Sequence, residues 1–149
     1  MIYIASDHAG FHLKKQLIQY LKIKGLEVED MGVFELDEND DYPDFIIPCA
    51  QKVAAESDSV GIVIGGSGQG EAIAANKVKG IRAALYYGGN LEIVRFSREH
   101  NDTNVLSLGA RFLTGDEAKK AVSIWLETGF DRASRHQRRH DKIAKVEQK

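Results

Sequence analysis

Short runs of apolar, often β-branched residues recur along the chain, and most precede a longer stretch in which apolar residues are spaced three or four apart. Runs of the first kind are typical of buried strands, and the spacing of the second kind is typical of amphipathic helices. The pattern predicts strands at residues 2–5, 26–29, 60–64, 80–86 and 105–108. It predicts helices over residues 11–21, 45–53, 90–98 and 115–125, and a further helix that begins at residue 71. Gly25 ends the first of these helices and Gly129 ends the last.

Strands and helices alternate from one end of the chain to the other, which is the pattern of a parallel sheet covered by helices. The predicted fold is a Rossmann-like three-layer α/β/α sandwich with a five-stranded parallel sheet and an extra C-terminal helix. A chain of 149 residues can bury a sizeable core, so residues 1–149 are expected to form a single domain. Residues 131–149 follow the completed sheet, and we expect their helix to pack on a partner subunit.

A glycine-rich segment with the sequence GGSGQGE, residues 65–71, follows the apolar run at 60–64 and opens a predicted helix. Such a turn leaves backbone N–H groups at the helix N-terminus, where they favour an anion or a developing oxyanion. It is not a phosphate-binding Walker A loop, because Glu71 and Ala72 stand where Lys and Ser or Thr are required, and its glycine spacing differs from the dinucleotide fingerprint. A carboxylate beside an oxyanion site indicates removal of a proton next to a carbonyl group. The alternative is that Glu71 only complements the helix dipole.

Three polar clusters are expected at the carboxyl edge of the sheet, where open α/β folds bind their ligands. They are Asp7 and His8 after the first strand, the glycine loop after the third, and Arg111 shortly after the fifth. His100 precedes the fifth strand, so its approach to this edge depends on how its loop folds. Simpler roles stay open for three of these residues: Asp7 as a helix cap, His8 as a hydrogen-bond partner of a loop, and Arg111 as a member of an ion pair.

The C-terminal segment is densely basic in a chain whose formal net charge is −2. Arg135 and Arg139 are four residues apart, so a helix places both guanidinium groups on one face. Two guanidinium groups on one face suit a phosphate. A solvated basic helix is the alternative interpretation.

Composition removes other classes of function. The small net charge argues against a general nucleic-acid binder and against a membrane-surface protein. The N-terminal residues do not resemble a signal peptide, and no apolar stretch approaches the roughly 20 residues of a membrane span. Cys49 is the only cysteine and lies on an apolar helix face, so we expect it in the core of a cytoplasmic protein without disulfides. Neither a metal nor a cofactor is expected, since no Cys and His cluster has zinc spacing.

Several motifs together resemble the ribose-5-phosphate isomerase B family, whose relatives include galactose-6-phosphate isomerases. The matching segments run nearly end to end: SDHAG at 6–10, DYP at 41–43, GSGQG at 66–70, AANK at 74–77, GIRA at 80–83, REHNDTN at 98–104, and RHQ at 135–137 followed by Arg139. The resemblance implies a metal-independent isomerase of carbohydrate metabolism, in the pentose phosphate pathway. Its reaction interconverts ribose 5-phosphate and ribulose 5-phosphate through an enediolate.

The resemblance also implies a role for individual positions. One branch of the family has a cysteine base directly after the third strand, where Gly65 stands here; another has a glutamate directly after the glycine loop, where Glu71 stands. Ring opening falls to His100 and Asp7, and the relay of a proton between O1 and O2 falls to Ser67. The substrate-binding residues implied are His8, Tyr42, Gly66, Gly68, Gln69, Gly70, Asn101, Arg111, Arg135 and Arg139. In this set the backbone of residues 66–70 forms the anion hole, Tyr42 borders the sugar, and the phosphate ligands are His8, Arg111, Arg135 and Arg139, the last two reaching across a dimer.

This chemistry agrees with the interpretation of the glycine loop. Removing the C2 proton of an aldose builds charge on O1, so a base and an oxyanion site must flank the same two carbons. The pKa of a free glutamate is about 4.3, and desolvation would raise it toward the working range of a base. A histidine such as His100 exchanges protons near neutral pH, which suits ring opening. The expected partners are a phosphorylated sugar and further copies of the chain, in a homodimer or tetramer with shared active sites. Two alternatives remain: an isomerase of a six-carbon sugar phosphate, such as allose or galactose 6-phosphate, and a non-catalytic sugar-phosphate-binding subunit.

Overall fold

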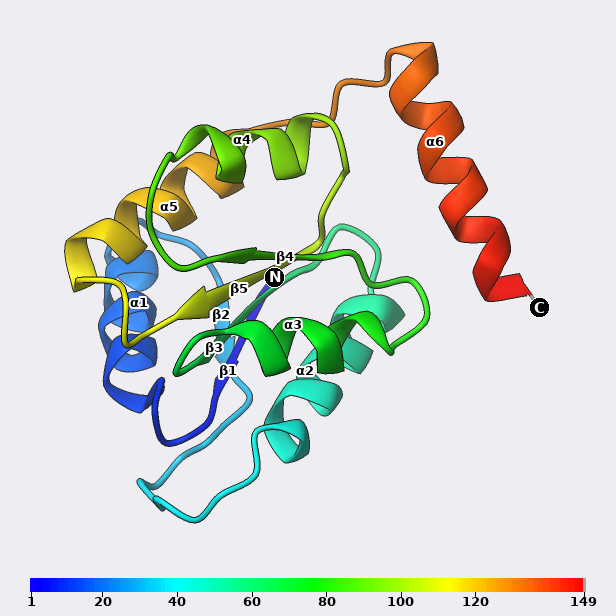
Figure 1. Ribbon diagram of the computed structural model, residues 1–149. Coiled ribbons are helices and arrows are strands. Elements are labelled where there is room, and N and C mark those ends of the chain that lie inside the picture. The colour runs from blue at the N-terminus through cyan, green and yellow to red at the C-terminus, as the bar shows by residue number, and fades with distance from the viewer. Residues whose placement is uncertain (149) are drawn as a thin grey trace.

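Five strands form one parallel sheet in the computed structural model, which describes residues 1–148 (Figure 1). The strands are β1 (Ile2–Ser6), β2 (Val28–Asp30), β3 (Val60–Gly65), β4 (Ala83–Tyr86) and β5 (Val105–Gly109). Their order across the sheet is β2-β1-β3-β5-β4, and every neighbouring pair is parallel. The predicted five-stranded parallel sheet is therefore confirmed.

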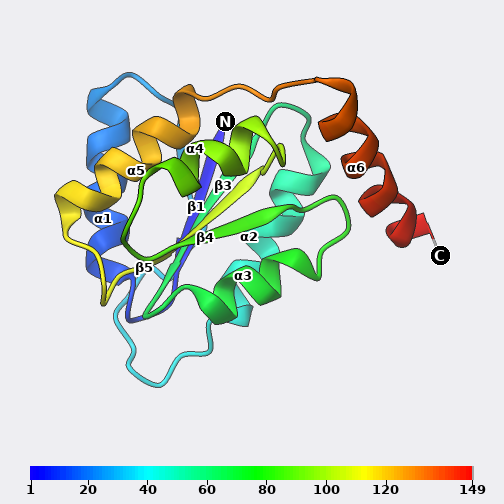
Figure 2. The same cartoon turned by 45° about the horizontal axis from the view of Figure 1, so that its top comes forward.

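Helices cover both faces of this sheet (Figure 2). They are α1 (Phe11–Ile23), α2 (Pro43–Ala55), α3 (Gln69–Asn76), α4 (Glu92–Glu99), α5 (Gly115–Glu127) and α6 (Ser134–Ala144), followed by a short 3-10 helix at Lys145–Gln148. Side chains of α1, α4 and α5 pack in one hydrophobic cluster, and side chains of α2 and α3 pack in the other. The three-layer α/β/α architecture is thus as predicted.

The central strands β1, β3 and β5 are mostly apolar because both of their faces are buried. Ile2 and Ile4 of β1 point into the cluster with α1 and α5, while Tyr3 and Ala5 point into the cluster with α2. Cys49 belongs to this second cluster and is fully buried, and burial raises its thiol pKa to about 12. Its predicted place in the core is confirmed, and a thiol in this state is a poor nucleophile.

Several element boundaries differ from the prediction by one to three residues, and glycine conformation explains two of them. Strand β4 begins at Ala83 and not at residue 80, because Gly80 has a φ of +86° and the turn before it closes with a bond from the Ile81 N–H to the Val78 carbonyl. Helix α3 begins two residues before Glu71, because Gly68 has a φ of +77° and its carbonyl already accepts the first helical hydrogen bond, from Ala72.

Helix α6 stands away from the sheet, beyond the edge strand β4, and an extended segment after α5 leads to it (Figures 1 and 2). Its contacts with the body are few: the buried His136 ring stacks on His100, and the Glu147 carboxylate accepts from the Gly80 N–H at 3.0 and 3.1 Å. Lys149, the last residue of the predicted C-terminal helix, lies outside the described residues. No helix within residues 1–148 is long and apolar enough to cross a membrane.

Candidate active site

The loop between β3 and α3 is held tightly against the end of β5. A Cβ atom on Gly68 would lie 2.9 Å from the backbone carbonyl of Leu108, so only glycine allows this approach. The Ser107 hydroxyl donates to the Gly68 carbonyl at 2.6 Å, and the Gln69 N–H donates to the Ser67 hydroxyl at 3.3 Å. The loop is therefore a fixed turn at the N-terminus of α3, where the first backbone N–H groups of a helix lack partners within it.

Glu71 is buried at the carboxyl end of β3, with only 4% of its surface exposed. A Cβ atom on Gly65 would lie 1.8 Å from its Oε1 atom, so the carboxylate occupies the space that any side chain at residue 65 would need. Burial raises the pKa of Glu71; its own backbone N–H lowers it, and the negative charge of Asp7 raises it further. A residue that only complements a helix dipole has no need of burial, so the geometry favours a general base.

Asp7 and His8 follow β1 at the same edge of the sheet. Asp7 is buried, and its Oδ1 atom accepts from the Gly10 N–H at 3.2 Å. Gly10 is the N-cap of α1, so this bond closes the turn before the helix and Asp7 does not cap the helix itself. The negative charge of Asp7 also raises the pKa of Glu71, so the two carboxylates lie at the same edge of the sheet. The His8 Nδ1 atom lies 2.6 Å from Oδ1 of Asp40, a residue that was not predicted to belong to the site.

Tyr42 and Arg111 border the glycine loop from two further elements. A Cβ atom on Gly70 would lie 2.6 Å from Cζ of the Tyr42 ring, and one on Gly66 would lie 2.9 Å from Nη1 of Arg111. Within residues 1–148 no carboxylate lies within ion-pair distance of the exposed Arg111 guanidinium, so the ion-pair alternative is not observed. The residues brought together at this edge are Asp7, His8, Tyr42, Gly66, Ser67, Gly68, Gln69, Gly70, Glu71 and Arg111.

His100 lies elsewhere in the same chain. It ends α4, which starts after β4 at the carboxyl edge and runs back toward the amino edge of the sheet. Four residues later the Asn104 carbonyl accepts from the N–H of Gly61, at the amino end of β3. The His100 ring is stacked between Phe96 at 4.7 Å and His136 at 4.6 Å. His100 and Asp7, the ring-opening pair implied by resemblance, therefore do not meet within one chain.

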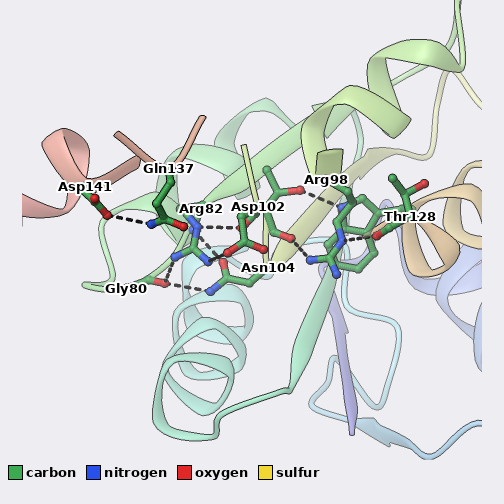
Figure 3. Close-up of polar contacts among 10 residues, drawn as sticks. Gly80, Arg82, Arg98, Asp102, Asn104, Thr128, Gln137 and Asp141 are labelled. Atoms are coloured by element: carbon green, nitrogen blue, oxygen red, sulfur yellow. Dashed lines mark hydrogen bonds and ion pairs between the residues drawn. The ribbon is translucent and has the colours of Figure 1, made fainter. Parts of the chain in front are cut away.

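Two arginines hold the loop that carries His100 (Figure 3). Arg82 donates from Nε to the Asp102 carbonyl at 2.7 Å, and Asp102 has a φ of +47°. Arg98 donates to the carbonyls of Thr103 and Thr128, and its guanidinium lies over the ring of Trp125. Burial lowers the pKa of Arg98. Because both guanidinium groups are bonded to loop carbonyls, they act here as structural supports and not as anion ligands.

A cleft of about 760 Å³ separates α6 from the edge of the sheet. Its lining includes Asn76, Ala83, His100, Asn101, Arg139 and Ile143. Arg135 lies on the same helix one turn before Arg139, and both are exposed. The predicted functional residues of the chain thus form two groups. The loop group consists of the residues listed above at the carboxyl edge, from Asp7 to Arg111. The tail group consists of His100, Asn101, Arg135 and Arg139.

The carboxyl edge also brings Asp7, His8 and Asp40 together, with one ligand atom of each within 4.8 Å of the others. These atoms already have partners within the protein: His8 Nδ1 is bonded to Asp40, and Asp7 accepts from Gly10. We therefore assign no metal to this group. Asp40 lies in the acidic, irregular segment before α2, and the only hint of its role in the sequence is its place two residues before Tyr42.

Comparisons with known proteins show the family to which the chain belongs. Residues 2–143 match the family model described as Ribose/Galactose Isomerase. The chain is 46% identical over 146 residues to ribose-5-phosphate isomerase B of Mycolicibacterium paratuberculosis, covering 98% of this chain and 91% of that protein. It is 46% identical, with a TM-score of 0.94, to the crystal structure of ribose-5-phosphate isomerase B from Mycoplasma genitalium with bound ribulose-5-phosphate, covering 99% of this chain and 96% of that one. A ribose-5-phosphate isomerase B structure from Clostridium thermocellum has the same identity and a TM-score of 0.91, with coverage of 99% and 97%.

The close packing of Gly65 and Glu71 gives a testable prediction. Gly65→Ala is expected to lower the free energy of unfolding by about 1–3 kcal/mol, because the new methyl group and the carboxylate need the same space. In a Glu71→Ala background this space is free, so the same substitution should cost little, and the double-mutant cycle should show a coupling energy of similar size. Urea unfolding of the four proteins measures both values. Gly129→Ala is the control, since nothing lies within 4 Å of its Cβ position. Equal costs of Gly65→Ala in both backgrounds would contradict the packing.

Proposed function

The chain belongs to the ribose/galactose isomerase family, and we propose that it interconverts ribose 5-phosphate and ribulose 5-phosphate. The observation that carries this proposal is the buried Glu71 carboxylate beside the glycine loop, since it combines a base of raised pKa with an oxyanion site. The relatives named above support the pentose phosphate as substrate, and one of them is described with bound ribulose-5-phosphate.

In the proposed reaction Glu71 removes the proton from C2 of the open-chain aldose, and the electrons of the C–H bond pass to O1. The backbone N–H groups of residues 66–70 and the N-terminus of α3 stabilise the negative charge that develops there. Ser67 moves a proton from O2 to O1, and the protonated Glu71 then gives its proton to C1. The product is a ketose with its carbonyl group at C2, and Glu71 is again a carboxylate. The raised pKa of Glu71 suits both halves of this transfer.

Ring opening precedes this step, and we propose that it needs residues from two subunits. Asp7 lies at the carboxyl edge with Glu71, whereas His100 lies in the tail group of the same chain. A homodimer that places the tail group of one subunit over the loop group of the other supplies both. His100 of the partner subunit then takes the proton of the anomeric hydroxyl as the bond between C1 and the ring oxygen breaks, and Asp7 passes a proton to that oxygen. The position of α6, beyond the edge strand and with few contacts to its own body, supports this arrangement (Figure 1).

Phosphate binding follows the same division between subunits. His8 and Arg111 belong to the loop group, and Arg135 and Arg139 of the partner subunit approach from α6. Tyr42 and Gln69 line the sugar on one side, with Asn101 of the partner subunit on the other. We place this single-domain enzyme in the cytoplasm and in the pentose phosphate pathway, acting without metal or cofactor. A dimer satisfies the arrangement, and a tetramer would contain the same pair.

The first prediction of this proposal concerns the substrate. The base acts at C2 and the cations hold the phosphate at the other end, so their separation selects the length of the sugar. One extra carbon should displace one end by about 1 Å or more, which costs on the order of 10²-fold in rate. We expect kcat/KM for ribose 5-phosphate to exceed the values for allose 6-phosphate and galactose 6-phosphate. A hexose phosphate that is better by tenfold would overturn the substrate while keeping the chemistry, and the absence of any isomerase activity would favour a non-catalytic binding subunit.

The second prediction concerns the base. Glu71→Gln keeps the shape of the side chain but cannot accept the C2 proton. We expect kcat to fall on the order of 10²-fold or more with little change in substrate affinity. Steady-state kinetics together with a binding titration separate the two quantities. Exchange of the C2 proton with solvent deuterium should slow in parallel. Turnover near the wild-type value would remove Glu71 from the mechanism.

The third prediction concerns shared sites. Glu71→Gln and Arg135→Ala homodimers should each be nearly inactive. In a hybrid of the two chains one site carries both defects and the other carries neither, so random subunit exchange should restore about a quarter of wild-type activity. Differently tagged subunits allow the hybrid to be purified and assayed. If verified hybrids recover no activity, each site is built within one chain.

A further inference from the structure

Asp40 reaches His8 from a different part of the chain, in the segment between β2 and α2. Its Oδ1 atom lies 2.6 Å from the His8 Nδ1 atom and also accepts from the His8 backbone N–H at 3.2 Å. The side chain of Asp40 is only 6% exposed, and that of His8 is 28% exposed. Within residues 1–148 every hydrogen bond of the Asp40 carboxylate goes to His8, and its buried Oδ2 atom has no partner there. The carboxylate therefore serves this histidine and not the loop that carries it.

This contact determines which nitrogen of His8 carries a proton. A carboxylate accepts hydrogen bonds and does not donate them, so Nδ1 holds the proton that faces Asp40. Nε2 has no hydrogen-bond partner within residues 1–148, and the His8 side chain is partly exposed. When the ring is charged, Nε2 is also a donor, and the group is then suited to a phosphate oxygen.

The charged groups around His8 come from three elements. Asp40 approaches from the segment before α2, Asp7 precedes His8 at the end of β1, and Arg111 lies after β5. The hydrogen bond with Asp40 is the largest influence on the pKa of His8 and raises it, while burial lowers it. The charge of Asp7 raises this pKa and that of Arg111 lowers it, and the net direction is upward.

We propose that Asp40 is a positioning residue that keeps His8 charged and oriented as a ligand for the phosphate of the sugar phosphate. This inference rests on the proposed function and adds a residue to it. A histidine beside Arg111 would otherwise lose its proton at lower pH, because two neighbouring cations repel each other. With Asp40 in place, His8 and Arg111 present two positive groups to one phosphate as long as the pH stays below the raised pKa of His8.

The raised pKa of His8 determines how phosphate binding should depend on pH. Because the pKa of His8 is raised, the imidazolium is fully present below the ordinary histidine pKa and is lost only as the pH rises through the raised value. Removing the charge of Asp40 moves this loss to lower pH. A variant without this charge should therefore bind phosphate as the wild type does near pH 6, and more weakly than the wild type near pH 8.

Asp40→Asn tests the proposal, because the amide oxygen can still accept from Nδ1 but the negative charge is gone. NMR titration of the imidazole resonances, in protein without substrate, should show the pKa of His8 lowered by on the order of 1 unit. KM for ribose 5-phosphate should rise on the order of tenfold near pH 8 and much less near pH 6, with kcat little changed. Asp40→Glu should restore part of both values. Glu38→Gln, which removes an exposed carboxylate from the same segment, should change neither.

Two outcomes would overturn the proposal. One is an unchanged pKa of His8 in Asp40→Asn; the other is a rise in KM that is the same at both pH values, which would indicate a merely structural role. Titration of the His8 resonances with inorganic phosphate keeps the test independent of catalysis. If wild-type protein lacks isomerase activity but its His8 shift and phosphate affinity still depend on Asp40, the proposed function fails and this inference stands.

Discussion

The close packing of a glycine and a carboxylate at the end of β3 is the constraint on which the site depends. Because Gly65 has no side chain, Glu71 can fold back from the first turn of α3 and bury its carboxylate against the end of the strand. Burial there keeps the group in a partly dry environment and raises its pKa, which is what a base for carbon acids requires. The glycine loop needs the same closeness, since Gly68 touches the backbone of β5. One turn therefore positions both the carboxylate and the backbone N–H groups to which we assign the roles of base and oxyanion donors.

The second constraint is topological. In a parallel sheet with helical crossovers, a residue at the end of a helix lies at the edge opposite to a residue at the end of a strand. His100 ends α4, and Glu71 lies at the end of β3, so a single chain separates them. Arg82 and Arg98 hold the His100 loop at the amino edge through backbone carbonyls, which leaves little freedom for it to move across the sheet (Figure 3). A shared site between subunits resolves this separation without any rearrangement of the fold.

Periodicity alone was enough to predict the sheet, its helices and the burial of Cys49, because each of these depends on local spacing and on the need to bury both faces of a parallel strand. The family resemblance predicted from motifs is confirmed by a match over residues 2–143. Two features were beyond this approach. The start of β4 depends on the positive φ of Gly80, and the contact of Asp40 with His8 joins residues 32 positions apart through an irregular segment. Neither hydrophobic spacing nor motif position carries information about such contacts. The assignment of roles to the site residues stays a prediction.

The ionisable groups at the carboxyl edge make the folded protein less stable as the pH rises. Burial raises the pKa of Glu71, so the folded chain holds this proton more tightly than the unfolded chain does. The free energy of unfolding therefore falls as the pH rises from the pKa of Glu71 in the unfolded chain through its raised pKa in the folded chain. The raised pKa of His8 acts in the same direction, since its favourable charge is lost as the pH rises. A bound phosphate dianion opposes the second loss, because it stabilises the imidazolium, and ligand binding to the folded state alone stabilises that state. At high pH the fold thus gives up stability at the proposed substrate-binding edge, and binding of a sugar phosphate there would offset the loss.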